Sequence, residues 1–292
     1  MKRERFAIGD VVIYAAFILF CLTIAVPFVH LLSVSFSPSY VATKGGLILW
    51  PQDFTTDNYI KVFNSKFIWM GYRNTILRTA VGTPVQLFIT AMGAYALSKK
   101  FFPHRSLWTF LIVFTMFFSG GLIPTYLLVK NLGLIDSYAS MILPGLVSAY
   151  NLVIMRNYFA AMPEEIEESC MIEGAGRFRT FFSIVIPLSM PIFATVALWL
   201  AVGHWNAWFD VLIYIMDDTK FTLQIVLRRI LITGTQQMFE MSTNSAFIEA
   251  SQASPEGMKA AAIFVATVPI LCIYPFIQRY FVQGIMIGSL KG

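Results

Sequence analysis

Long stretches without a charged residue dominate the chain. Six windows contain no Asp, Glu, Lys or Arg: those between Asp10 and Lys44, Arg78 and Lys99, Arg105 and Lys130, Asp136 and Arg156, Arg179 and Asp210, and Lys259 and Arg279. Each window has roughly the 20 residues that a helix needs to cross a 30 Å hydrocarbon layer. The pattern predicts six transmembrane helices, at residues 10–36, 74–98, 107–130, 136–159, 182–208 and 259–286.

Composition supports the same interpretation. Of the 292 residues, 57% are hydrophobic and only 13% are charged, whereas soluble domains carry about 25% charged residues. The apolar run after the basic start "MKRER" is longer than the core of a signal peptide, so we expect the first segment to be retained. The predicted fold class is an all-α integral membrane protein, with one transmembrane domain over residues 1–292.

The cations lie at the boundaries of the expected spans. With six spans, these residues fall on one side of the membrane, which the positive-inside rule makes cytoplasmic: Lys2, Arg3, Arg5, Lys99, Lys100, Arg105, Arg156, Arg177, Arg179, Arg279 and Lys291. Both termini are then expected in the cytoplasm. Because the cations lie at membrane boundaries, the net charge of +5 does not call for nucleic acid as a partner. The expected partner is the lipid bilayer.

Two long loops, residues 37–72 and 210–258, are expected on the outer side. The first mixes turn signals with aromatic residues, as in a short helix or lid pressed on the outer surface. Eight prolines fall inside the expected spans, where each removes a backbone hydrogen bond. Such breaks are tolerated in lipid where neighbouring helices or a cavity satisfy the freed groups. Together they favour a helical bundle with a pathway through it over simple anchors.

Several chemistries have no counterpart in the sequence. No GxxxxGK[ST], HExxH or GxSxG motif occurs, which argues against ATP binding by this chain and against common hydrolase sites. The three histidines and three cysteines lack metal-ligand spacing, so neither a metal site nor a disulfide framework is expected. The span centres hold no ionisable residue, which argues against proton-coupled transport.

Acidic residues gather in "AMPEEIEESCMIEGAGRFRT", residues 161–180. Glu164, Glu165, Glu167, Glu168 and Glu173 are five of the 16 acidic residues in the chain. A proline and then glutamates suit the first turn of a helix, and the following "GAG" is a natural stop. The glutamates are like-charge neighbours, so two interpretations stand about even: a solvated acidic loop, or a surface that meets cations of another protein.

The order of residues in this stretch resembles a known motif. Glu168-Ser169-Cys170, three residues, Gly174, nine residues and "IVIP" at 184–187 are similar to the EAA loop, E-A-A-x3-G-x9-I-x-L-P, of membrane subunits of binding-protein-dependent ABC importers. Ser169 and Cys170 replace the two alanines, and Ile186 replaces the leucine. The segments 120–159, 204–210 and 284–292 resemble the carbohydrate-importing, maltose-type branch, and within it the oligo- and polysaccharide subfamily that includes alginate importer permeases.

This resemblance implies a type I importer permease fold and a place in the bacterial cytoplasmic (inner) membrane. The chain would carry an oligo- or polysaccharide, with an acidic alginate-like one as a candidate, from a periplasmic or extracellular binding protein to the cytoplasm. The implied partners are a homologous second permease subunit, two copies of a cytoplasmic ATPase and a soluble solute-binding protein. ATP and Mg would be bound by the ATPase, so the chain itself holds no cofactor and is not an enzyme. The implied coupling residues are Glu164, Glu165, Glu168, Ser169, Cys170, Gly174 and Arg177.

A saccharide route is expected where aromatic faces and hydrogen-bonding groups occur together. The candidate residues are Trp205, Asn206, Trp208, Phe209 and Asp210 at the outer end of the fifth span, with Tyr150, Asn151 and Gln86 in other spans. Anchoring at the membrane interface explains Trp and Tyr equally simply. Arg78, Arg228 and Arg229 could bind an acidic saccharide, and interface anchoring explains these as well.

Two other classes of function stay open. An intramembrane enzyme acting on lipid-linked sugars would need an ionisable catalytic pair near the pathway, which the sequence does not offer clearly. A secondary transporter is the third candidate. Copurification with an ATPase would favour the importer, and activity of the lone chain would favour the alternatives.

Overall fold

The structure, a computed structural model, describes residues 8–233 and 254–289. Every regular element in these ranges is helical, which confirms the predicted all-α class. Predictions for the basic start (Lys2, Arg3 and Arg5), for Lys291 and for much of the second outer loop lie outside the described residues.

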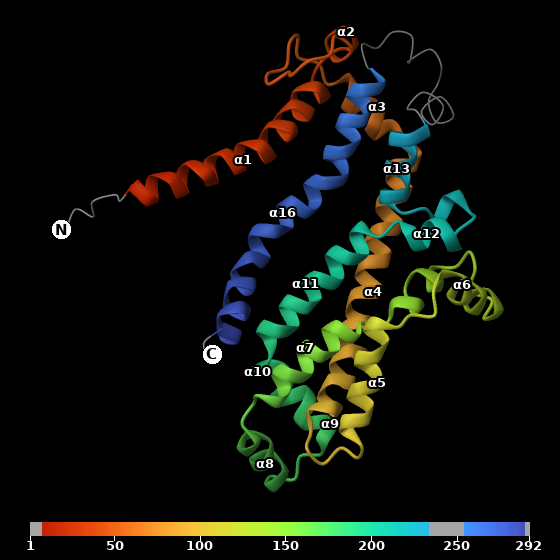
Figure 1. Ribbon diagram of the computed structural model, residues 1–292. Helices are drawn as coiled ribbons and strands as arrows, with labels where there is room; N and C mark the ends of the chain where they lie inside the picture. The colour runs from red at the N-terminus through yellow and green to blue at the C-terminus, as the bar shows by residue number, and fades with distance from the viewer. Residues whose placement is uncertain (1–7, 234–253, 290–292) are drawn as a thin grey trace. The chain divides into compact units, whose positions relative to one another are not determined.

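Three long helices and a series of shorter ones make up the described chain (Figure 1). The long helices are α1 (Ile8–Ser35), α4 (Lys66–Ser98) and α16 (Pro255–Ser289). The shorter elements are α2 (Ser39–Ala42), α3 (Asp57–Asn64), α5 (Arg105–Phe117), α6 (Leu122–Asn131), η1 (Tyr138–Met141), η2 (Leu143–Gly145), α7 (Ala149–Ala160), α8 (Glu164–Ile172), α9 (Arg177–Thr180), η3 (Phe181–Val185), α10 (Ile186–Leu188), α11 (Met190–Asn206), α12 (Phe209–Tyr214), η4 (Asp218–Lys220) and α13 (Leu223–Thr233).

Three of the expected spans are single helices and three are bent pairs. By length and composition, Gly9–Ser35, Lys66–Ser98 and Pro255–Cys272 can each cross a membrane. The other three candidates are α5 with α6, the η1–η2 segment with α7, and α9–α10 with α11, bent by 112°, 53° and 83°. The described residues thus offer three spans, or up to six if each bent pair is one span; the exact boundaries and the single-domain organisation stay predictions.

Local sequence explains where the bent pairs break. Gly121, at the start of α6, has φ +86°, a conformation that glycine adopts without steric cost. The third pair contains one turn of π-helix, η3, and Pro187 and Pro191 flank its break at Ser189. Proline cannot donate the backbone hydrogen bond that would carry the helix through. These segments therefore depart from regular helix at a glycine or next to prolines, which lack a backbone N–H.

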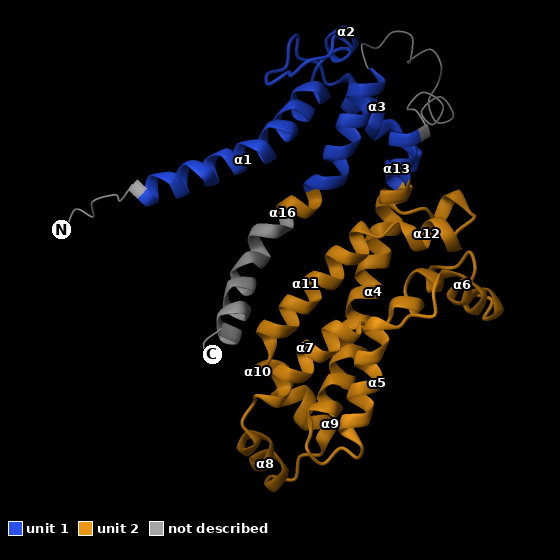
Figure 2. Cartoon of the chain, in the orientation of Figure 1, with its two compact units in different colours: residues 1–69, 226–268 blue, residues 70–225, 269–292 orange. Residues whose placement is uncertain are grey.

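The chain forms two compact units, residues 1–69 with 226–268, and residues 70–225 with 269–292 (Figure 2). In the first unit, the Asn58 side chain of α3 is fully buried. Its amide nitrogen donates to the carbonyls of Ser35 and Ser37, both at 3.0 Å, and its oxygen accepts from the Ser254 amide at 3.1 Å. A Cβ on Gly257 would lie 2.4 Å from the Asn58 nitrogen. Asn58 therefore joins the end of α1, α3 and the start of α16.

The second unit has an apolar core shared by α4, α7, η3 and α11. Its buried members are Ala91, Ala94, Leu97, Leu152, Met155, Phe159, Phe181, Val185, Ile192, Phe193, Val196 and Leu200. Small residues on α4 let the neighbouring helices approach closely. Figure 1 shows α8 beside α9 at one end of this unit and α12 toward its other end.

We predict that Asn58→Ala destabilises the protein by roughly 3 kcal/mol, because it leaves two carbonyls and one amide buried without a partner. The measurement is denaturation of the purified protein in detergent. Asn64→Ala, an exposed position on the same helix, is the matched control and should change stability little. Equal stability of the two variants would contradict the assigned role of Asn58.

Candidate functional site

Helix α8 forms where the acidic stretch was expected to begin a helix. Pro163 is its N-cap, with φ −57° and ψ 130°, and three glutamates occupy the first turn. Carboxylates at this end complement the positive end of the helix dipole. The acidic stretch is thus helical from Glu164 to Ile172.

A glycine turn ends α8. Gly174 has φ +85°, and its amide donates to the Met171 carbonyl at 3.0 Å while the Ala175 amide donates to the Cys170 carbonyl at 2.9 Å. These two bonds are the pattern of a Schellman cap, which needs a left-handed residue at the position of Gly174. The cap reverses the chain, so that α9 begins at Arg177.

One glutamate of α8 faces inward. Glu167 is only 7% exposed, and its carboxylate forms an ion pair with Lys99, the residue after α4. The Tyr95 hydroxyl donates to its other oxygen at 3.2 Å, and the Lys99 ammonium lies 4.4 Å from the centre of the Tyr95 ring. Removing one member of a buried ion pair typically costs about 3–5 kcal/mol. We call Lys99, Glu167 and Tyr95 the anchor of α8.

A second ion pair lies beside the anchor and is exposed. Lys100 Nζ lies 2.8 Å from Glu164 Oε1, and both side chains are more than half exposed. The hydrogen bond and charge of Lys100 hold the pKa of Glu164 below its usual value. Solvent screening makes such a surface pair worth little, so it adds less to the fixation of α8 than Glu167 does.

The outward face of α8 combines carboxylates with apolar groups. Glu165, Glu168 and Ser169 are exposed, and the side chain of Ile172 is 87% exposed. These positions are three and four residues apart and lie on one face of the helix. Cys170, by contrast, is half-buried, and its thiol donates to the Ile166 carbonyl at 3.1 Å. We call Glu165, Glu168, Ser169 and Ile172 the outward face.

Arg177 lines a pocket beside α8 together with Glu164, Glu167 and Glu168. Its guanidinium carbon is 3.7 Å from the centre of the Phe101 ring, in the loop that follows α4. The structure therefore brings Glu164, Glu165, Glu168 and Ser169 together on α8, with Arg177 close to two of them and over the Phe101 ring. Their roles in coupling stay predictions.

The aromatic cluster at the end of α11 is only partly accessible. Trp205 is buried, and its ring lies 6.3 Å from the ring of Tyr72 in an edge-on arrangement. Trp208 and Phe209 are also edge-on, at 5.5 Å. Asn206 and Phe209 are exposed. Of the expected saccharide contacts in this cluster, these two and the half-buried Trp208 present surface, and Trp205 has a packing role.

Asp210 is engaged by an arginine of α4. Arg78 forms an ion pair with its carboxylate, and Arg78 Nη1 lies 3.2 Å from Asp210 Oδ1. Arg78 Nη2 also donates to the Met141 carbonyl at 3.0 Å, and Arg78 Nε donates to His204 Nδ1 at 3.3 Å. The Arg78 side chain is 5% exposed. One buried cation thus joins α4, η1, α11 and α12, which argues against a direct contact of Arg78 with saccharide.

The remaining pathway candidates serve other segments of the second unit. Gln86 is buried, and its amide donates to the Gly145 carbonyl at 2.6 Å. The Ser148 hydroxyl caps α7 by accepting from the backbone N–H of Asn151 at 3.4 Å, and the Asn151 side chain is buried. Tyr150 is exposed, with its ring 6.1 Å from that of Trp199. Gln86 and Ser148 hold the segment before α7, whereas Tyr150 presents surface; a role in the saccharide route stays a prediction for Gln86, Asn151 and Tyr150.

Sequence reasoning missed the pairing partners of the charged residues. It recognised Glu167 only as one member of an acidic cluster, and Lys99 only as a boundary cation. The usable signal was that Lys99 directly follows a charge-free window and Glu167 lies in the charged segment 156–179, which the expected topology puts on the same side of the membrane. Arg78 and Asp210, similarly, are charges at the edges of two spans, and pairing them requires knowing that α4 and α11 are neighbours.

We predict that Asp210→Ala lowers stability by about 3 kcal/mol, because it leaves the buried Arg78 without its carboxylate. The measurement is the denaturation midpoint in detergent without saccharide. Asn206→Ala, from the same cluster, should leave the midpoint nearly unchanged. A stable Asp210→Ala variant that has lost only saccharide-stimulated ATP hydrolysis would instead assign Asp210 to substrate binding.

Comparisons with known proteins agree with this architecture. Residues 68–287 match the family described as "Binding-protein-dependent transport system inner membrane component". The chain is 39% identical to the polygalacturonan/rhamnogalacturonan transport system permease protein YtcP of Bacillus subtilis (strain 168), over 100% of both chains. It is 41% identical to Protein LplC of the same organism, over 91% of this chain and 89% of that one.

A solved structure supports the fold in particular. It is described as a bacterial ABC transporter involved in the import of the acidic polysaccharide alginate, and one of its chains is 30% identical to this one. The match has a TM-score of 0.87 and covers 95% of this chain and 99% of the other, which confirms the predicted type I importer permease fold. The chain belongs to the family of inner membrane components of binding-protein-dependent transport systems.

Proposed function

We propose that this chain is the permease subunit of an ATP-driven importer of acidic oligosaccharides, in which α8 couples the membrane helices to a cytoplasmic ATPase. The chain transmits motion and lines the route, and ATP chemistry belongs to the ATPase. The family membership and the sugar-transporting relatives support an importer. They give no support to an intramembrane enzyme acting on lipid-linked sugars.

The outward face of α8 is the observation that carries the coupling role. A solvated acidic loop would have no reason to expose Ile172 beside Glu168 along a capped helix. An apolar side chain among carboxylates fits a cleft that is basic and partly apolar, where desolvated ion pairs count for more than surface ones. We therefore assign the outward face to the ATPase interface, with Glu168 as its central carboxylate.

The anchor gives this interface a mechanical path. Because Glu167 pairs with Lys99 at the end of α4, a displacement of α8 acts on α4, which is 33 residues long. Helix α4 in turn shares its buried core with α7, η3 and α11. Closure of the ATPase would thus move several membrane helices as a packed body, and the bent pairs offer places where the pathway can open.

The cations around α8 support the proposed orientation. Lys99, Lys100, Arg177 and Arg179 lie at this end of the second unit, so the positive-inside rule places it in the cytoplasm. Trp205 to Asp210 lie toward the other end of α11 (Figure 1), which suits an outer entrance. Six spans would then put both termini in the cytoplasm.

The substrate class is proposed from the relatives. Alginate is named as an acidic polysaccharide in the matching structure, and polygalacturonan is by its name a polymer of galacturonate. We propose that this chain carries oligosaccharides rich in uronate, delivered by a soluble binding protein. A second, homologous permease subunit would complete the route, and two ATPase copies would bind below.

We predict that Glu168→Lys abolishes coupling without preventing membrane insertion. A lysine facing a basic cleft costs several kcal/mol, so stimulation of ATP hydrolysis by binding protein and saccharide should fall about tenfold or more. The assay uses the importer reconstituted in proteoliposomes. Glu173→Lys makes the same charge change at the exposed C-cap residue that follows α8 and should keep most of the stimulation. Wild-type stimulation in Glu168→Lys would defeat the proposed coupling role.

We predict that oligogalacturonate or alginate oligomers stimulate ATP hydrolysis by the reconstituted importer, and that neutral maltooligosaccharides do not. The comparison is made at matched oligomer length with the cognate binding protein present. Preferential stimulation by the neutral series would contradict the acidic substrate class and would leave the importer assignment intact.

A further inference from the structure

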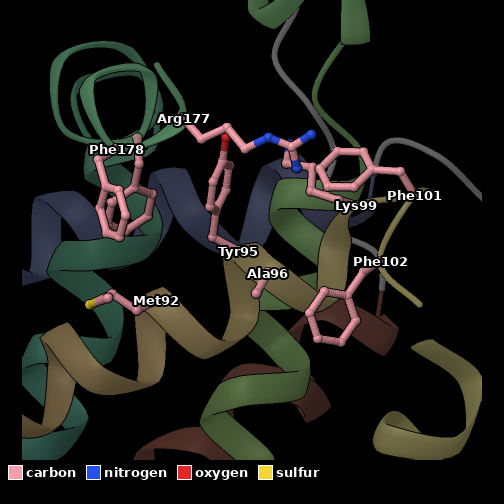
Figure 3. Close-up of a pocket in the computed structure, with 9 residues that line it drawn as sticks. Met92, Tyr95, Ala96, Lys99, Phe101, Phe102, Arg177 and Phe178 are labelled. Carbon is pink, nitrogen blue, oxygen red and sulfur yellow. The ribbon is translucent and has the colours of Figure 1, made fainter. Parts of the chain in front are cut away.

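A cavity lies in the second unit between the end of α4, the loop after it and the start of the α9–η3 segment. Its volume is about 240 Å³. The residues that line it are Met92, Tyr95, Ala96, Lys99, Phe101, Phe102, Arg177, Phe178 and Phe181 (Figure 3). Seven of these nine side chains are aromatic or aliphatic, all except Lys99 and Arg177, so the wall suits a hydrocarbon.

The two cations that line the cavity, Lys99 and Arg177, differ in whether they form an ion pair. Lys99 is paired with Glu167. Arg177 is exposed and lies over the Phe101 ring, and none of the ion pairs among the described side chains includes it. Figure 3 shows its side chain extending from its helix toward Phe101. The cavity therefore combines an apolar interior with one unpaired, positioned guanidinium at its edge.

We propose that this cavity binds an anionic phospholipid of the inner leaflet, with part of an acyl chain inside and the phosphate on Arg177. A guanidinium matches phosphate geometry with two parallel hydrogen bonds. The volume is below the roughly 300–1,000 Å³ of pockets for drug-sized ligands, so it holds a segment of chain and leaves the rest in the bilayer. The proposal rests on the proposed orientation, in which this end of α4 is at the inner headgroup level.

The position along the chain favours a lipid over a soluble anion or a protein side chain. Lys99 directly follows the apolar span Lys66–Ser98, which places the cavity at the boundary between hydrocarbon and headgroups. Basic pockets between membrane helices on this side commonly bind anionic headgroups. A free phosphate would leave the apolar wall uncovered. Phe101 and Phe178, which are 55% and 72% exposed, would be covered by acyl chains.

Lipid binding would also reach the coupling helix. Lys99 and Tyr95 line the cavity and also hold Glu167 in the anchor. A lipid in the cavity excludes water from this side of the Lys99–Glu167 pair, which strengthens the attraction between the two charges. A lipid bound in the cavity is therefore expected to raise coupled ATP hydrolysis.

The test is native mass spectrometry of the purified importer assembly with phosphatidylglycerol or phosphatidylcholine added. Arg177→Gln keeps the cavity and removes the charge, so we expect the preference for phosphatidylglycerol to fall roughly tenfold. Ala96→Phe fills the cavity and keeps the charge, so retention of both lipids should fall. Arg179→Gln removes an exposed cation of the same helix that does not line the cavity and should behave as wild type.

Two outcomes would overturn the proposal. One is wild-type lipid retention in both Arg177→Gln and Ala96→Phe. The other is cross-linking of a photoreactive residue at position 178 to the ATPase and not to lipid, which would make the cavity part of a protein interface. Stimulation of wild-type ATP hydrolysis by saccharide is measured separately, so a lipid site that fails while stimulation persists leaves the proposed function standing.

Discussion

The ion pair between Lys99 and Glu167 is the interaction on which the α8 end of the second unit depends. It turns one glutamate of a crowded acidic helix inward and thereby leaves Glu165, Glu168 and Ile172 facing out. The pair is nearly buried, with side-chain exposures of 16% and 10%, and Tyr95 supports both members. Its position at the end of α4 ties α8 directly to a helix that is long and apolar enough to cross a membrane.

The same physical constraint, that a buried polar group needs a partner, organises the rest of the described chain. Arg78 satisfies its charge with Asp210 and thereby holds four segments together. The uncharged Asn58 side chain bonds to three backbone groups, two at the end of α1 and one just before α16. In a protein whose apolar surface faces lipid, hydrophobic burial distinguishes poorly between helix neighbours. A few internal polar contacts therefore specify which helices are adjacent.

Much of this could be predicted from the sequence, and the limits have physical causes. Charge-free windows are set by bilayer thickness, so the helical class followed directly from them. The acidic helix and its glycine turn were predictable because Pro163 and Gly174 act locally. Pro187 and Pro191 marked the break at residue 189 as a candidate site, but the bend angles of 112°, 53° and 83° could not be predicted, since they depend on packing against neighbouring helices. Nor was the inward direction of Glu167 predictable, because it depends on a lysine 68 residues earlier in the chain. Pairings across long sequence separations need the packed structure.

The most direct test of the account is a photo-cross-linking scan along α8 in the assembled importer during ATP turnover. A photoreactive amino acid is placed in turn at positions 165, 167, 168 and 172. The account predicts cross-links to the ATPase from 165, 168 and 172, and cross-links within the permease chain from 167. Equal labelling of the ATPase from all four positions, or from none of them, would contradict it, because the anchored helix presents only one face.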